Sequence, residues 1–231
     1  MSGKTAQTVA RRRIDQAELD AICARHDRLW QAKPGGARAV LAWLDLSGLS
    51  LRGRNLADAD FAAASLIGTD LSGAKLDNAT FFGGDMQDCI LVEASMRRAD
   101  LRGACLRGAD LTGADLFEAD LREGTIAAAD AKLGFKIVEA KSRNETEAQG
   151  ACLAGANLER SKLTGIVAVA ADFSDAIMRD CKMVRANLKQ ASFRGADLAG
   201  AELAPPLLAA ASQDRRVVAG ARIAWRPRGA P

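Results

Sequence analysis

A hydrophobic residue recurs at every fifth position over most of this chain, and this period restricts the possible folds more than any other feature. In the clearest stretch, residues 98–120, the recurring residues are Leu101, Leu106, Leu111 and Leu116. An alanine lies two residues before each leucine, and a glycine lies two residues after the first three. A period of five fits neither the 3.6-residue period of an α-helix nor the two-residue alternation of a strand. The chain is therefore interpreted as an internal repeat.

The repeated pattern A-D/N-L-x-G resembles the pentapeptide-repeat family. This resemblance implies an all-β fold, a right-handed quadrilateral parallel β-helix in which four pentapeptides make one square coil. The central residue and the small residue two places before it would point inward, and the other three positions outward. The pattern keeps one phase from Leu46 to Ile126 and continues in a second run from Leu153 to Leu208. Together the two runs predict a solenoid of about seven coils.

The central residues of the two runs form the predicted structural core. With four pentapeptides per coil, residues 20 apart should stack, so Phe61 should lie against Phe81. The predicted core residues are Leu46, Leu51, Leu56, Phe61, Leu66, Leu71, Leu76, Phe81, Met86, Leu91, Met96, Leu101, Leu106, Leu111, Leu116, Leu121, Leu153, Leu158, Leu163, Phe173, Met178, Met183, Leu188, Phe193, Leu198 and Leu203.

The segment before the repeats is expected to cover one end of the solenoid. Residues 1–13 are basic and are predicted to be disordered, and an apolar face with helical spacing predicts an N-terminal α-helical cap over residues 14–43. An open β-helix end exposes strand edges and apolar interior. Trp30 or Trp43 should therefore lie against the end of the interior column. This arrangement also resembles the N-terminus of bacterial members of the family.

The repeat loses its phase between the two runs. A pentapeptide-repeat β-helix is predicted over residues 44–208, as runs 44–128 and 151–208, interrupted by a loop or short helix at about 129–150. The interruption could carry function, as loops in repeat proteins often do, or it could be a tolerated insertion, because lengthening a loop costs little. Residues 209–231 are predicted to form a C-terminal cap or basic tail, with a homodimer contact as one role considered for this end.

The sequence offers little that could catalyse a reaction. His26 is the one histidine of the chain, and it lies on an apolar helix face, where a packing role is expected. The sequence contains no nucleophile motif, no phosphate-binding loop and no Cys/His spacing typical of a metal site. We therefore predict a protein that is not an enzyme, with no catalytic residue, metal or cofactor.

Targeting features are also missing from the sequence. The basic N-terminus is not followed by an apolar stretch, so no signal peptide is predicted, and no run of about 18 apolar residues could span a membrane. The five cysteines lack C-x-x-C spacing, which fits a reducing compartment. The prediction is a cytoplasmic protein.

Two groups of residues are candidates for a partner surface. The first consists of apolar side chains at outward positions, although single exposed apolar residues need no explanation. The second consists of charged residues in the interruption. The candidates are Ile67, Phe82, Ile90, Val92, Phe117, Val167 and Val169 in the first group, and Lys136, Glu139, Lys141 and Arg143 in the second.

The charge distribution leaves two function classes open. Residues 44–126 hold 14 acidic and eight basic residues, whereas the whole chain has a net charge of +3. The first class is a non-catalytic protein–protein interaction scaffold with an unknown partner. The second, implied by the family resemblance, is a DNA-mimicking protein that binds DNA gyrase or topoisomerase and protects it against quinolones or peptide toxins. The basic ends would weaken such mimicry, and direct nucleic acid binding is not expected, because the acidic run would repel phosphates.

Overall fold

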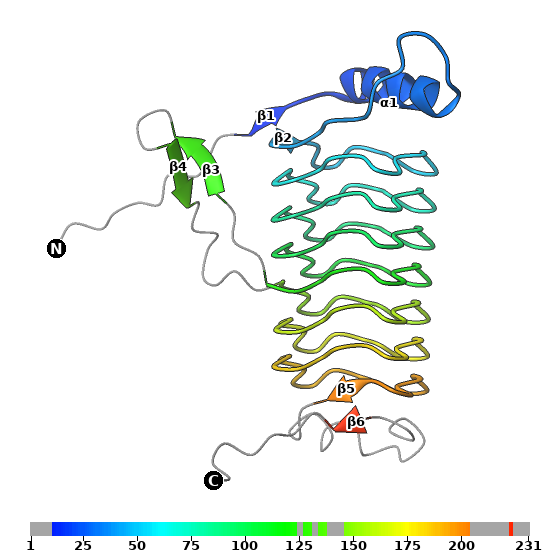
Figure 1. Cartoon of the computed structure of the whole chain (residues 1–231), viewed down its shortest axis with the longest axis vertical. Coiled ribbons are helices and arrows are strands. Elements are labelled where there is room, and N and C mark those ends of the chain that lie inside the picture. The colour runs from blue at the N-terminus through cyan, green and yellow to red at the C-terminus, as the bar shows by residue number, and fades with distance from the viewer. Residues whose placement is uncertain (1–10, 124–126, 131–133, 138–145, 204–221, 224–231) are drawn as a thin grey trace, which may run out of the picture.

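The chain winds into a stack of coils, which is drawn vertically in Figure 1. Its backbone bridges are parallel and join residues 20 apart in the first run, as from Asp60 to Thr80 and from Thr80 to Asp100. The fold is therefore a β-helix solenoid, as the resemblance to the pentapeptide-repeat family implied. This computed structural model describes residues 11–123, 127–130, 134–137, 146–203 and 222–223.

The bridged residues line up in four columns, and each column marks one face of the solenoid. We name the faces A to D in chain order, and each face includes the two corner residues that follow its central residues. The bridged residues are Val40, Asp60, Thr80, Asp100, Asp120, Lys162, Lys182 and Glu202 on face A; Asp45, Ser65, Asp85, Cys105, Glu147, Val167 and Asn187 on face B; Ser50, Asp70, Ile90, Asp110, Cys152, Asp172 and Ser192 on face C; and Asn55, Lys75, Ser95, Asp115, Asn157, Ile177 and Asp197 on face D.

The corners explain the glycines and many of the aspartates of the repeat. Gly103 and Gly108 have φ values of 65° and 66°, in the left-handed region that glycine adopts without steric cost. The residue before the centre of a repeat holds the corner that follows it: an Asp110 oxygen accepts a hydrogen bond from the Thr112 N–H. This carboxylate-to-backbone contact is typical of aspartate at turns.

The interior is one continuous apolar column. Every predicted core residue is buried, and burial of a leucine-sized side chain stabilises the fold by about 1.5–3 kcal/mol. The Phe61 and Phe81 rings stack with centroids 4.8 Å apart and planes at 6°, as their separation of 20 residues predicted. Phe173 and Phe193 stack in the same way in the second run.

The N-terminal segment lies over the first coil (Figure 1). Strand β1 (Arg12–Arg13) pairs in parallel with β2 (Leu44–Asp45), so these two residues form part of the ladder and are not disordered as predicted. Residues 1–10 lie outside the described residues. Helix α1 (Gln16–Trp30) begins at the N-cap Asp15, whose side chain accepts from the Glu18 N–H.

Helix α1 contacts the solenoid through its buried residues Leu19, Cys23 and His26. The expected place of Trp30 against the interior column is wrong, because its side chain is 52% exposed and meets His26 edge-on. Leu19 and Cys23 of the helix belong instead to the same buried apolar cluster as the core of the solenoid. Trp43 is half-buried.

A hairpin interrupts the solenoid where a loop or short helix was predicted. Strands β3 (Ala127–Asp130) and β4 (Gly134–Ile137) pair antiparallel, and Figure 1 places them beside the stack. Strand β3 begins inside the segment assigned from sequence to the first run. Ile126, the last predicted centre of that run, lies outside the described residues.

The solenoid resumes at Thr146 and Glu147, earlier than the predicted start at residue 151. Glu147 bridges to Cys105, so 42 residues separate the two, 22 more than in an ordinary coil. Thr146 is buried, and its hydroxyl accepts from the Gly103 N–H and donates to the Arg122 carbonyl. These hydrogen bonds hold the returning chain at the corner from which it left.

At the other end, β5 (Glu202–Leu203) pairs in parallel with β6 (Arg222–Ile223). The rest of the predicted C-terminal cap or tail lies outside the described residues. Within the described ranges, no helix has both the length and the apolar character needed to cross a membrane.

Candidate functional site

Faces A and D carry most of the ion pairs of the solenoid. Their outward carboxylates lie beside basic side chains, commonly two residues later in the chain or one coil away. The pairs are Arg38–Asp60, Arg102–Asp100, Arg122–Asp120, Lys162–Asp120 and Arg185–Glu123 on face A, and Arg97–Asp115, Arg160–Glu118 and Arg179–Asp197 on face D. Each of these seven carboxylates is therefore balanced locally by a basic side chain.

Face C has a different chemistry. Among the described residues, its one ion pair joins Arg52 to Asp70 at 3.8 Å. Going down the column, acidic and apolar residues alternate from coil to coil: Asp70, Ile90, Asp110, Cys152 and Asp172. The residue two places after each also alternates, between a hydroxyl and an apolar side chain: Ser72, Val92, Thr112, Ala154 and Ser174.

The hydroxyls on face C hold the carboxylates beside them. Ser72 and Thr112 each donate from the side chain and the backbone N–H to the aspartate two residues earlier, and Ser174 does the same to Asp172. The side-chain hydrogen bonds of Ser72 and Ser174 lower the pKa of Asp70 and of Asp172. Both aspartates therefore stay negatively charged well below neutral pH.

The apolar candidates from sequence fall on different faces. Ile90 and Val92 lie on face C, and Ile67 lies at the corner before it; Ile67 and Ile90 are 40% and 41% exposed. Val167 and Val169 lie half-buried on face B. The structure therefore brings Ile90 and Val92 together with the carboxylates of face C and leaves the other candidates apart.

Two aromatic candidates are covered by arginines. The Arg102 guanidinium lies over the Phe82 ring, 5.2 Å from its centroid, and Phe117 has Arg97 and Arg160 at 4.5 Å and 5.5 Å. Such cation–π contacts reduce the apolar surface that these rings offer to a partner.

The charged candidates of the interruption are only partly placed. Lys136 belongs to strand β4. Glu139, Lys141 and Arg143 lie outside the described residues. The aspartates of face C were not singled out from sequence, although an aspartate followed two residues later by a serine or threonine recurs at the same place in alternate coils and could have indicated them.

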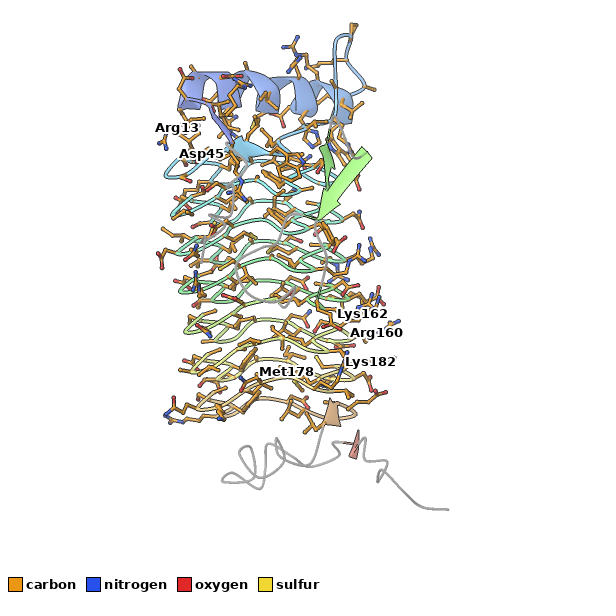
Figure 2. The ribbon with its side chains drawn as sticks, turned by 90° about the vertical axis from the view of Figure 1, so that its left-hand side faces the viewer. Arg13, Asp45, Arg160, Lys162, Met178 and Lys182 are labelled. Atoms are coloured by element: carbon orange, nitrogen blue, oxygen red, sulfur yellow. The ribbon has the colours of Figure 1, made fainter. Side chains whose placement is uncertain are left out.

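A shallow hollow of about 520 Å³ opens on face A and the corner before it. Figure 2 shows two of its residues, Arg160 and Lys162, on the same side of the solenoid as Lys182. Its charges largely pair with one another, as between Asp120 and Lys162. Burial alone would raise the pKa of Asp120, but hydrogen bonds from Arg122 outweigh it and lower that pKa. The hollow is therefore balanced internally.

Three of the five cysteines and the histidine are buried and poorly suited to chemistry. Burial raises the pKa of the Cys89 and Cys181 thiols to about 12, and that of Cys23 to about 11, so they stay protonated at neutral pH, whereas the thiolate is the nucleophile. His26 is fully buried, its Nδ1 accepts from the Ala39 N–H at 3.0 Å, and burial lowers its pKa. These groups serve packing.

Comparison with known proteins agrees with this geometry. A family model described as pentapeptide repeats matches in eight copies, and no curated protein matches the chain. The matched residues are 45–83, 85–117, 94–125, 151–190 and 171–204.

Several solved structures are similar to the chain. A trypsin-treated form of QnrB1, a plasmid-mediated fluoroquinolone resistance protein, is 17% identical with a TM-score of 0.48, and the match covers 73% of this chain and 75% of that chain. HetL, a pentapeptide repeat protein involved in heterocyst differentiation regulation in the cyanobacterium Nostoc, is 24% identical with a TM-score of 0.22, covering 76% and 93%. Rfr23 from the cyanobacterium Cyanothece is 19% identical with a TM-score of 0.24, covering 77% and 96%. Likenesses at this level carry no inference about function.

Proposed function

The chain belongs to the pentapeptide-repeat family, and we propose that it is a non-catalytic scaffold that binds a protein partner through the outer faces of its solenoid. The observation that carries this proposal is the chemical difference between the faces. On faces A and D, seven carboxylates lie beside an arginine or lysine, whereas on face C the described residues leave Asp110 and Asp172 without an ion pair and place apolar groups between them.

The rigidity of the backbone supports this role. Each coil hydrogen-bonds to the next through repeated contacts, such as Leu101 N–H to the Asp120 carbonyl and Asp120 N–H to the Ala99 carbonyl. Outward side chains are therefore held at fixed spacing, which reduces the entropy lost on binding. The burial of three of the five thiols and of the histidine favours a binding role over catalysis.

A second candidate is the DNA-mimicking protein that binds gyrase or another topoisomerase. The excess of acidic residues over residues 44–126 favours it. The ion pairs on faces A and D weigh against it, because each places a guanidinium or ammonium beside a carboxylate and reduces the field that a DNA-binding protein would meet.

Three further features belong to this proposal. The coils are right-handed as in the family, helix α1 acts as the N-terminal cap, and the protein works in the cytoplasm, where its five free cysteines would stay reduced. A homodimer contact through the C-terminal end remains a prediction.

Affinity capture tests the proposal. The full chain is immobilised and exposed to cytoplasmic extract of the native host, and bound proteins are identified against a chain unfolded by Leu106→Asp. We expect one partner enriched in near-stoichiometric amount. If no protein is enriched over this control, the scaffold proposal fails. Recovery of gyrase subunits, followed by protection of purified gyrase in a supercoiling assay, would replace it with the second candidate.

A further inference from the structure

We propose that face C binds a basic amphipathic α-helix laid along the solenoid axis. Each coil contributes one rung to this face, and the cationic residues of the helix would lie on the aspartate rungs and its apolar residues on the rungs between them. This inference rests on the proposed function and names the surface and the chemistry of the partner.

The spacing of face C matches such a helix. Neighbouring rungs of a β ladder are about 4.8 Å apart, so Asp70, Asp110 and Asp172, on alternate rungs, follow at intervals of about 9.6 Å. One turn of an α-helix rises about 5.4 Å, and seven residues rise about 10.5 Å. A lysine or arginine at every seventh position would therefore meet successive aspartates, and an apolar residue one turn later would meet the rung between them.

The small mismatch between the two repeats is tolerable. It amounts to about 0.9 Å for each interval between aspartates. Lysine and arginine carry flexible stems that can lean along the helix axis by more than this. Over the five rungs, each cationic head can therefore stay within reach of its carboxylate.

The carboxylates of face C are available for this contact. Among the described residues, no basic side chain lies within 4 Å of Asp110 or Asp172, and Asp70 has only Arg52, at 3.8 Å. The hydroxyls of Thr112 and Ser174 orient the two unpaired aspartates without neutralising them. On faces A and D, seven outward carboxylates already have an arginine or lysine within 4 Å, which a partner cation would first have to displace.

The rungs between the aspartates supply apolar contact. Ile90 is among the few large hydrophobic side chains that the described residues expose, at 41%, and Val92 lies beside it at the corner. The next apolar rung, Cys152 and Ala154, carries smaller side chains. Alternation of apolar and acidic rungs selects a partner with the matching alternation, because a misplaced cation would lie on Ile90 and a misplaced leucine on a carboxylate.

The test uses synthetic helical peptides and the full chain. The matching peptide carries lysine at every seventh position and leucine one turn after each lysine, with alanine and glutamine elsewhere. The comparison peptide has the same composition with lysines and leucines on opposite sides of the helix. Binding is measured by fluorescence anisotropy at low ionic strength, where exposed charges are least screened.

We expect the matching peptide to bind more tightly than the comparison peptide. Asp110→Asn/Asp172→Asn should weaken it about threefold to tenfold, the range typical of losing two exposed ion pairs. Ile90→Ser should weaken it about threefold, through lost apolar contact. All three positions point outward, and circular dichroism checks that the variants are folded.

Matched controls lie on other faces. Asp58→Asn/Asp180→Asn makes the same charge change at the corner between faces D and A, and Ile177→Ser changes an isoleucine with 39% exposure at the same repeat position on face D. Both should bind like the wild type. Equal binding of the two peptides, or equal losses in test and control variants, would overturn the proposal for face C. A partner captured from extract equally by wild type and by Asp110→Asn/Asp172→Asn would also overturn it, while leaving the scaffold function intact.

Discussion

The side-chain amide of Gln16 hydrogen-bonds to both backbone groups of Ser50, donating to its carbonyl and accepting from its N–H, each at 2.9 Å. Ser50 is the first bridged residue of face C, where no strand precedes it in the ladder. The glutamine side chain therefore makes the two hydrogen bonds with Ser50 that a neighbouring strand would otherwise make. On face B the same edge is covered by strand β1.

Replacing Gln16 should loosen this end. Gln16→Ala removes both hydrogen bonds and should cost about 1–3 kcal/mol, measured by urea unfolding. Gln16→Glu should cost at least as much, since a carboxylate cannot donate to the Ser50 carbonyl. Gln149→Ala, at an exposed corner, is the control and should leave stability unchanged. A similar loss in that control would argue against a specific role for the contact.

Shortening a central residue should create a cavity in the column. Leu106 is fully buried, so Leu106→Ala should lower the free energy of unfolding by about 2–5 kcal/mol. Leu106→Asp should prevent folding, because it buries an unpaired charge. Lys75→Ala, at an exposed outward position, should change stability by less than about 0.5 kcal/mol. Denaturant unfolding followed by circular dichroism measures all three.

The hydroxyl groups of face C should increase the stability of the folded protein in acid. The hydrogen bond from Ser174 lowers the folded-state pKa of Asp172 below its unfolded value. The stability that this aspartate contributes is therefore complete above the unfolded pKa of about 3.9 and is lost as pH falls through the lower folded value. Ser174→Ala should raise the Asp172 pKa and shift acid unfolding to higher pH, as followed by NMR titration. Ser174→Thr should keep both near wild type, because Thr112 makes the same contact on the same face. An unchanged Asp172 pKa in the alanine variant would contradict this.

Removal of the hairpin should preserve the stability of the solenoid, provided that the returning residues from Thr146 onward are kept. Replacing residues 127–143 by a Gly-Ser linker should leave the melting temperature within a few degrees, because the two halves of the solenoid bridge directly through Cys105 and Glu147. Extending the replacement through Gln149 should lower it strongly, since the buried Thr146 and the rung at Glu147 are then lost. Equal melting temperatures for the two deletions would mean that the return point is not at residue 146.

The repeat made the core predictable. The central position of each repeat must be apolar, so the central residues follow from counting in fives. The stacking of Phe61 on Phe81 follows from the four repeats per coil that the family resemblance implies. The return at residue 146 was missed because its central residue is Ala148 and its inward partner is Thr146, both atypical of the repeat. The pairing of Arg12 and Arg13 was missed because two arginines carry no strand signal of their own.

The chemistry of the faces was harder to predict, because the number of residues in the interruption decides which residues of the second run lie on which face. Cys152 lies on Asp110 only because 22 additional residues leave and return at one corner. A boundary set at residue 151 does not place these two residues on neighbouring coils of one face. The outward positions also have no fixed residue type, so their neighbours in space are not evident from their neighbours in sequence.

The long step from Cys105 to Glu147 also sets how this molecule would come apart under tension. Each coil is fastened only to the coils above and below, so a pull on the two ends would strip it one coil at a time. An ordinary coil would pay out 20 residues, about 70 Å of extended chain, whereas the coil containing the hairpin would pay out 42 residues, about 150 Å. In a force–extension record, unfolding of the coil that contains the hairpin would therefore appear as one long extension step among shorter steps of equal length.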